Sequence, residues 1–229
     1  MKLLLFDIDG TLVSTGGAGI RALNRAFHEV LGLENALDGI RPHGKTDPAI
    51  VREVFDACEP SSRPLDCVSR ILDTYLRFLP DEVRNSGSYR VLPGIESFLD
   101  AFHTRPDLAF GLATGNLERG ARIKLERGSL NRYFPFGGFG SDSEKRAELV
   151  RRAAERGAQI AGVPVSPDAV FVIGDTPRDV YAGREAGFRT VGVATSDYSL
   201  DDLQKAGADL VLSDFESGRD QFLRMARIE

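Results

Sequence analysis

Two aspartates with short spacing follow the first apolar run of the chain. Residues 3–6 are three leucines and a phenylalanine, and Asp7, Asp9 and Gly10 come next. In open α/β sheets ligands bind at the carboxyl ends of the strands, so both carboxylates are expected at such an end. Two carboxylates this close repel each other unless a cation lies between them or one is protonated. The pair therefore indicates a site for a hard divalent cation such as Mg²⁺; the alternative is an acidic turn that caps a helix.

A second apolar run ends in the same way. Residues 170–173 lead into Asp175, and Asp179 follows one helical turn later. Asp175 can join Asp7 around a metal ion, and Asp179 can orient the metal ligands or a water molecule. Taken alone, the segment is equally well explained as a strand, a turn and a helix with Pro177 at its first position.

A third apolar run, residues 109–113, is followed by Thr114, Gly115 and Asn116. A hydroxyl group and exposed backbone N–H groups after a strand can form a small anion-binding nest. On their own these three residues are typical of an ordinary turn. In combination with the carboxylates they indicate a place for a phosphate group.

Lys145 and Arg146 form a basic pair at the start of a predicted helix. A cation beside a helix N-terminus can hold a phosphoryl oxygen and balance the negative charge of the aspartates. Such a pair is otherwise a solvated surface feature. Together the four segments supply a nucleophile, metal ligands, a phosphate nest and a cation, which are the parts that phosphoryl transfer requires.

The elements that must position these residues are apolar runs that alternate with helical stretches. This alternation indicates an α/β fold, a Rossmann-like parallel sheet with helices on both faces. The runs expected to be strands are residues 3–6, 109–113, 169–173, 190–193 and 210–212. Apolar residues recur at helical spacing most clearly in residues 95–102 and 148–156.

Residues 15–88 break this alternation. Their apolar residues recur at helical spacing in three stretches, around residues 20–31, 50–55 and 65–79. Asp47 is expected to be the N-cap of the second helix, because Pro48 would take the first helical position. We therefore expect an inserted α-helical cap domain over residues 15–88, and a catalytic core domain formed by residues 1–14 and 89–229.

The composition is that of an ordinary globular chain of 229 residues, with an apolar fraction of 42% and a net charge of −5. This size suits one domain with a smaller insertion, and the charge gives no reason to expect nucleic acid as a partner. No apolar stretch has the length of a membrane span, and the apolar start is too short for a signal peptide. Cys58 and Cys67 are expected to be free thiols in a reducing compartment, so a cytoplasmic location is expected. A monomer and a homodimer stay equally open.

The motifs resemble those of the haloacid dehalogenase superfamily, in particular its phosphoglycolate-phosphatase-like branch with a helical cap. Residues 7–11 match the first motif, residues 114–116 the second and residues 174–179 the fourth. The resemblance implies that Asp7 attacks phosphorus and forms an aspartyl-phosphate. It also implies that Asp9 protonates the leaving alcohol and then deprotonates the hydrolytic water.

The resemblance further implies a set of binding residues. Mg²⁺ would be held by the Asp7 carboxylate, the backbone carbonyl of Asp9 and Asp175, with Asp179 beside them. Thr114 is expected both to bind phosphate and to assist catalysis. The residues expected to contact the phosphate or the rest of the substrate are Gly10, Thr114, Gly115, Asn116, Lys45 and Thr46.

Two segments depart from the commonest family pattern or leave alternatives open. The third motif lacks its usual lysine before proline, so either Arg146 or Lys145 can be the functional cation. We favour Arg146, because a guanidinium offers a bidentate fork. Residues 43–47 resemble a cap loop that reaches toward the active site, where Lys45 would pair with an anionic part of the substrate. Residues 14–19, which include several glycines, are expected to be the hinge of the cap.

A phosphatase acting on a small phosphorylated metabolite is the leading hypothesis. On the same scaffold a phosphomutase stays open, and phosphonate cleavage stays open because Lys45 lies in the predicted cap. Dehalogenation is disfavoured, since Asp9 suits a proton transfer that halide departure does not need. A phosphoacceptor signalling domain would be shorter, and a non-catalytic phosphate-binding protein would not need Asp7, Asp9, Thr114 and Asp175 together.

Overall fold

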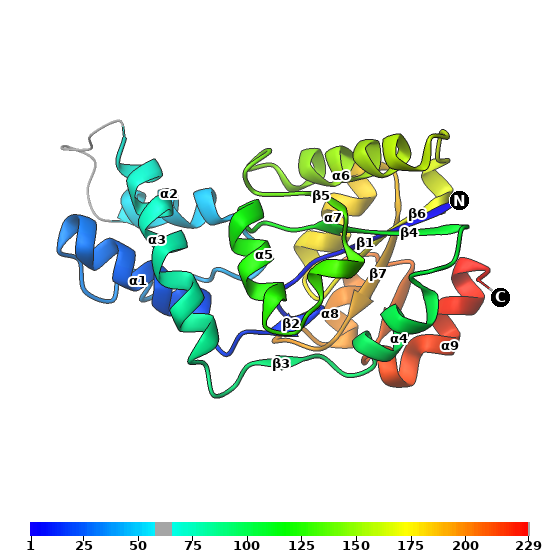
Figure 1. Cartoon of the computed structure of the whole chain (residues 1–229), viewed down its shortest axis with the longest axis horizontal. Coiled ribbons are helices and arrows are strands. Elements are labelled where there is room, and N and C mark those ends of the chain that lie inside the picture. Colours follow the sequence, from blue (N-terminus) through cyan, green and yellow to red (C-terminus); the bar gives the residue numbers. More distant parts are fainter. Residues whose placement is uncertain (58–65, 229) are drawn as a thin grey trace.

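A computed structural model describes residues 1–57 and 66–228 of the chain. Figure 1 shows two parts, a β-sheet covered by helices and a group of three helices, α1, α2 and α3. Both ends of the chain lie in the sheet part, on the side away from the three helices.

The sheet has six parallel strands in the order β5-β4-β1-β6-β7-β8, which confirms the predicted α/β fold. The strands are β1 (Lys2–Phe6), β4 (Leu108–Ala113), β5 (Phe136–Gly138), β6 (Val170–Gly174), β7 (Arg189–Val193) and β8 (Leu210–Leu212). The sequence pattern missed β5, because three residues that include two glycines carry no periodic signal. Residue 169 does not open β6 as expected, since Pro167–Ala169 form a 3₁₀ turn.

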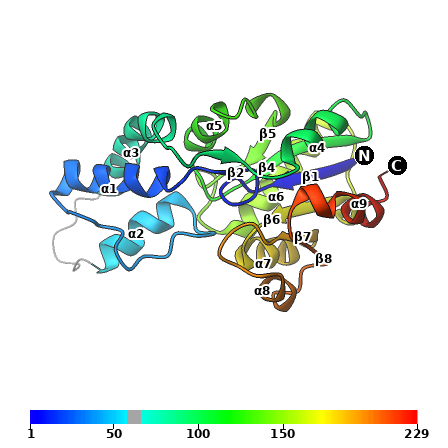
Figure 2. The same ribbon diagram turned by 90° about the horizontal axis from the view of Figure 1, so that it is seen from below.

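Helices cover both faces of this sheet, as Figure 2 shows. The core helices are α4 (Ile95–Phe102), α5 (Glu118–Glu126), α6 (Arg146–Ala161), α7 (Pro177–Ala186), α8 (Leu200–Lys205) and α9 (Phe215–Ala226). Leu4 and Phe6 of β1 lie in one apolar cluster with residues of α4 and α9. Leu3 and Leu5 lie in another with residues of α6 and α7. Burial on both faces explains why β1 is an uninterrupted apolar run.

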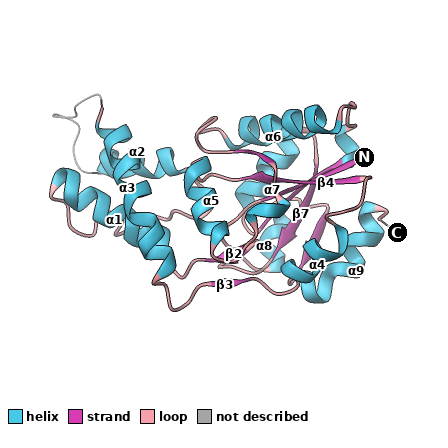
Figure 3. Ribbon diagram, viewed as in Figure 1, coloured by secondary structure: helices cyan, strands magenta, loops and turns pink. Residues whose placement is uncertain are grey.

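The other part consists of α1 (Ala18–Leu31), α2 (Asp47–Ala57) and α3 (Cys67–Arg84), which Figure 3 shows as three cyan helices. These helices share an apolar cluster of their own that includes Phe27 and Tyr75. Two chain segments join them to the sheet, and they pair with each other as antiparallel β2 (Val13–Ser14) and β3 (Arg90–Val91). The division into a core and a moving cap stays a prediction. Helix α1 begins inside residues 14–19, so part of the predicted hinge is helical.

The start of α2 differs from the expectation that Asp47 caps it. Helix α2 begins at Asp47, and the hydroxyl of Thr46 accepts a hydrogen bond from the backbone N–H of Ala49 at 3.3 Å. Thr46 is therefore the capping residue, and the N-cap prediction for Asp47 was wrong. This arrangement leaves the Asp47 carboxylate free for contacts outside its own helix.

Other expectations concern the cysteines and membranes. Cys67 is a buried free thiol, while Cys58 and the predicted start of the third helix at residue 65 lie outside the described residues. Within residues 1–57 and 66–228 no helix is long and apolar enough to cross a membrane.

Candidate active site

A cavity of about 430 Å³ lies where the carboxyl ends of three strands meet the loops from α1 and α2. Strand β1 is hydrogen-bonded to β4 on one side and to β6 on the other, with Phe6 opposite Leu112 and Ile173. The residues that follow the three strands are therefore neighbours. Asp7 lies between Thr114 and Asp175, and all three line the cavity.

Three buried carboxylates form one group. One oxygen from each of Asp7, Asp175 and Asp179 lies within 4.8 Å of the others. Burial and the charge of Asp179 raise the pKa of Asp7 to about 7, and burial likewise raises the pKa of Asp175 well above its usual range. Thr11 donates a hydrogen bond to Asp175 at 3.0 Å. Gly10, at φ +82°, approaches Asp175 so closely that a Cβ would collide with its carboxylate.

Arg146 is the cation beside this group. It is the first residue of α6, its guanidinium lies 3.6 Å from Asp7, and it forms an ion pair with Asp179. Its side chain is 10% exposed, and its Nε has no hydrogen-bond partner among the described residues. Lys145, the other candidate, is 80% exposed and pairs with Glu148. The structure thus brings Arg146 to the carboxylates and leaves Lys145 outside the cavity.

Asp179 has less freedom than the other two carboxylates. Its Oδ2 accepts hydrogen bonds from the backbone N–H and the hydroxyl of Thr176, at 3.1 and 2.7 Å. Its Oδ1 accepts from Arg146. With both oxygens engaged, Asp179 is suited to hold Arg146 and the start of α7 in place.

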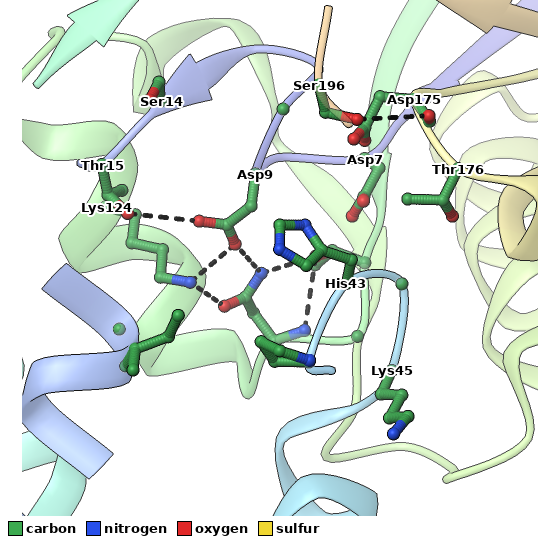
Figure 4. A pocket seen from close by; sticks show the side chains of 18 of the residues that line it. Asp7, Asp9, Ser14, Thr15, His43, Lys45, Lys124, Asp175, Thr176 and Ser196 are labelled. Carbon is green, nitrogen blue, oxygen red and sulfur yellow. Dashed lines mark hydrogen bonds and ion pairs between the residues drawn. The ribbon is translucent and has the colours of Figure 1, made fainter. Parts of the chain in front are cut away.

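Asp9 points away from Asp7, toward Lys124 (Figure 4). Its Oδ2 accepts from Lys124 Nζ at 2.6 Å and from Asn116 Nδ2 at 2.9 Å, and Oδ1 lies 3.5 Å from the Thr15 hydroxyl. Burial opposes the charge on Asp9, but the ammonium of Lys124 and these hydrogen bonds outweigh it and lower the pKa of Asp9. Asp9 is therefore ionised, and its carboxylate does not belong to the group around Asp7.

Lys124 is the residue that the sequence analysis missed. It is 5% exposed, and its ammonium also donates to Asn116 Oδ1 at 2.6 Å. Burial lowers the pKa of Lys124, but the carboxylates of Asp9 and Asp47 raise it above the usual value. The available signal is its position on the buried face of α5 with Ala121 and Leu125, where an unpaired charge is costly.

The loop before α2 reaches the cavity through Gly44 and Lys45. Lys45 lines the cavity, yet its ammonium pairs with Glu53 and points away from Asp7 in Figure 4. Thr46 is buried as the cap of α2 and does not line the cavity. Gly115 meets this loop directly: its carbonyl accepts from Asp47 N at 2.8 Å, and a Cβ would collide with the Lys45 carbonyl.

The phosphate-nest residues lie together at the end of β4. The Thr114 hydroxyl accepts from Asn116 N and Nδ2 at 3.3 and 2.8 Å, and its proximity to Asp7 lowers the pKa of that carboxyl. Both side chains are buried, and both residues line the cavity. The hydroxyl of Thr114 and the amide of Asn116 thus connect the Asp7 end of the cavity to Asp9.

The donor set fits a hard divalent cation. The three carboxylates are buried and close together, and the charge of Asp179 helps to raise the pKa of both Asp7 and Asp175. The single positive charge of Arg146 does not balance three carboxylates. Oxygen donors of this kind are those that Mg²⁺ and similar ions prefer. Asp7 and Asp175 have the freer oxygens and would hold the ion.

The chain thus has a parallel α/β sheet with buried aspartates at the carboxyl ends of β1 and β6. The family model described as haloacid dehalogenase-like hydrolase matches residues 4–193. The chain belongs to this family, so the predicted family and the hydrolase class are confirmed.

Relatives agree with this placement. The chain is 27% identical to a phosphoglycolate phosphatase of Caulobacter vibrioides, over 93% of this chain and 86% of the relative. It is 25% identical to glycerol-1-phosphate phosphohydrolase 1 of Saccharomyces cerevisiae, over 94% and 83%. A solved hydrolase structure from Pseudomonas syringae has the same fold, with a TM-score of 0.74 at 22% identity over 98% and 99% of the two chains.

Proposed function

We propose that this hydrolase is a Mg²⁺-dependent phosphatase that cleaves a small organic phosphate monoester through an aspartyl-phosphate on Asp7. The observation that carries the proposal is the position of Asp7: buried at one end of the cavity, within 4.8 Å of Asp175 and 3.6 Å from Arg146. A nucleophile, a cation site and a fixed guanidinium at one point are what phosphoryl transfer needs. The names of the two relatives, both enzymes of phosphate esters, support the same class.

In the first step a carboxylate oxygen of Asp7 bonds to phosphorus as the bond from phosphorus to the ester oxygen breaks. Protonated Asp9 gives its proton to the leaving oxygen, so an alcohol departs. In the second step water attacks phosphorus, ionised Asp9 takes a proton from that water, and the bond from Asp7 to phosphorus breaks. The lowered pKa of Asp9 favours the ionised form that this second step requires.

Other groups position the phosphoryl oxygens. Arg146 and the Thr114 hydroxyl lie beside Asp7 and can neutralise or hydrogen-bond the charge that spreads over these oxygens. A bound Mg²⁺, held by Asp7 and Asp175, would supply further charge neutralisation. A cavity of about 430 Å³ suits a substrate of metabolite size.

The test is phosphate release from p-nitrophenyl phosphate and a panel of small phosphate esters, with Mg²⁺ and then with EDTA. We expect Mg²⁺-dependent release that EDTA abolishes and added Mg²⁺ restores. A folded, Mg²⁺-supplied protein that releases phosphate from none of these esters would contradict the proposal.

A further inference from the structure

The cavity has a second end, opposite the carboxylate group around Asp7. There it is lined by Leu23 and Ile50, which are apolar, and by Asp47, Tyr75 and Lys124, which are polar. The first four of these belong to α1, α2 and α3, whereas Lys124 belongs to α5. This end faces the part of a substrate that lies beyond Asp9.

Asp47 presents an unused acceptor to this end. It is 5% exposed, and its Oδ2 accepts from the backbone N–H of Leu117 at 2.9 Å. Within residues 1–57 and 66–228 nothing donates a hydrogen bond to its Oδ1. Because Thr46 caps α2 in its place, Asp47 is not needed by its own helix.

Tyr75 brings a hydroxyl to the same end of the cavity. The side chain is fully buried and the residue lines the cavity. It lies near Lys124 and the backbone of α1, since a Cβ on Gly19 would be 3.4 Å from Lys124 Nζ and 3.9 Å from the hydroxyl. Burial and the charges of Asp47 and Asp9 raise its pKa well above the usual value, so the hydroxyl stays protonated.

The one ammonium at this end is already balanced. Lys124 is the one ammonium between Asp9 and Asp47 in the described cavity lining, and Lys45 is engaged by Glu53. Burial raises the pKa of Asp47 only to about 6, so at pH 7.5 its carboxylate balances the charge of Lys124 even while Asp9 carries the proton for the first step. A further carboxylate here would be repelled, whereas a hydroxyl can donate to Asp47 and accept from Tyr75.

We infer that Asp47 and Tyr75 form a leaving-group subsite that takes an uncharged, hydroxyl-bearing alcohol and disfavours one that carries a carboxylate. The inference rests on the proposed phosphatase function and names the substrate class of that same cavity. One cation argues for the opposite preference: Arg90, an exposed residue of β3, lines the rim. It therefore serves as the control in the test.

The test compares three phosphate esters of two-carbon alcohols at pH 7.5 with Mg²⁺. They are 2-hydroxyethyl phosphate, 2-phosphoglycolate, in which a carboxylate replaces the CH₂OH group, and ethyl phosphate, which has neither. We expect kcat/KM to favour 2-hydroxyethyl phosphate over 2-phosphoglycolate by roughly tenfold or more, the size of a hydrogen bond to a charged group.

Two variants assign this preference to the subsite. Asp47→Asn keeps an acceptor for Leu117 but removes the charge, and should reduce the preference by roughly tenfold. Tyr75→Phe keeps the ring and should lower kcat/KM for 2-hydroxyethyl phosphate by a few-fold to roughly tenfold while leaving ethyl phosphate unchanged. Arg90→Gln should leave the preference unchanged.

The inference is overturned if the wild-type protein prefers 2-phosphoglycolate. It is also overturned if neither Asp47→Asn nor Tyr75→Phe alters the preference, or if Arg90→Gln does. Release of phosphate from neither these three esters nor p-nitrophenyl phosphate would instead contradict the proposed function, and the subsite with it; cleavage of p-nitrophenyl phosphate alone would overturn the subsite only. Faster hydrolysis of 2-phosphoglycolate than of 2-hydroxyethyl phosphate would overturn the subsite but would still agree with the proposed phosphatase function.

Discussion

The ammonium of Lys124 lies 2.6 Å from Oδ2 of Asp9. The side chain of Lys124 is buried, whereas that of Asp9 is 42% exposed to the cavity. The contact therefore holds the proposed proton carrier on its protein side and leaves it open toward a substrate.

Replacing Lys124 tests whether it positions Asp9. Lys124→Met should lower kcat by roughly ten- to hundred-fold, less than the loss of an acid–base group itself. Because Lys124 lowers the pKa of Asp9, the limb of the kcat–pH profile that reports Asp9 should move to higher pH. Lys124→Arg should recover part of the rate. Lys145→Met, at an exposed site, is the matched control, and an unshifted profile in Lys124→Met would refute the positioning role.

Arg146 and Lys145 are adjacent in sequence, but the side chain of Arg146 is largely buried and that of Lys145 is exposed. Arg146→Gln should reduce kcat/KM by roughly 10²- to 10³-fold, since it removes a donor aimed at the transferring phosphoryl group. Arg146→Lys should be intermediate, because an ammonium lacks the bidentate fork. Lys145→Gln should have little effect. Equal losses in Arg146→Gln and Lys145→Gln would show that the cation has been wrongly assigned; circular dichroism checks that each variant is folded.

A divalent cation should stabilise the protein, because it relieves repulsion among Asp7, Asp175 and Asp179. Mg²⁺ at 100 times its Kd stabilises by about 2.7 kcal/mol, which raises the Tm of a chain of this size by roughly 5–10 °C. EDTA should reverse the shift, and Asp175→Asn should remove most of it. Thermal unfolding that is indifferent to Mg²⁺ in the wild-type protein would count against a metal site here.

Burial of Asp47 should appear as a pH dependence of stability. Its pKa is about 6 in the folded protein, above the ordinary value of 3.8 for this carboxyl group, so the folded protein binds the proton more tightly. The stability contributed by protonated Asp47 is complete below pH 4 and is lost as the pH rises through 6. The Asp47→Asn variant has no group that titrates at this position. The free energy of unfolding of this variant minus that of the wild type should therefore increase by up to about 3 kcal/mol between pH 4 and pH 7.5.

Urea unfolding of both proteins at the two pH values measures this gain. Asp220→Asn, at an exposed position of α9, is the control and should show none. A constant difference between Asp47→Asn and wild type across this range would mean that Asp47 ionises as it does in water.

The strand-ending residues could be predicted from sequence because the signal is local. An apolar run that stops at an aspartate or a threonine fixes both the strand and the end at which the polar group lies. Parallel pairing of β1 with β4 and β6 then brings Asp7, Thr114 and Asp175 together without further information. This is why the parallel sheet could be predicted apart from β5, and why these three residues lie together as expected; their roles stay predictions.

The remaining residues depend on tertiary contacts that no local pattern contains. Lys124 is important only because α5 packs so that its buried face meets Asp9. Asp47 is released from capping only because Thr46 takes that role, and its partner Leu117 is 70 residues away. Lys45 lines the cavity as predicted, and its ion pair with Glu53 of α2 could not be read from the sequence. Its predicted contact with a substrate stays a prediction.

The proposed mechanism depends on Asp7 as the nucleophile, and the rate of phosphate release by Asp7→Asn measures whether it is. The change removes the attacking oxygen's charge at nearly constant size, with Asp220→Asn as the control for an exposed aspartate. With Mg²⁺ and the best ester of the panel, we predict that Asp7→Asn loses activity by roughly a thousand-fold or more, while Asp220→Asn matches the wild type. A folded Asp7→Asn protein that releases phosphate at a rate near that of the wild type would contradict the account.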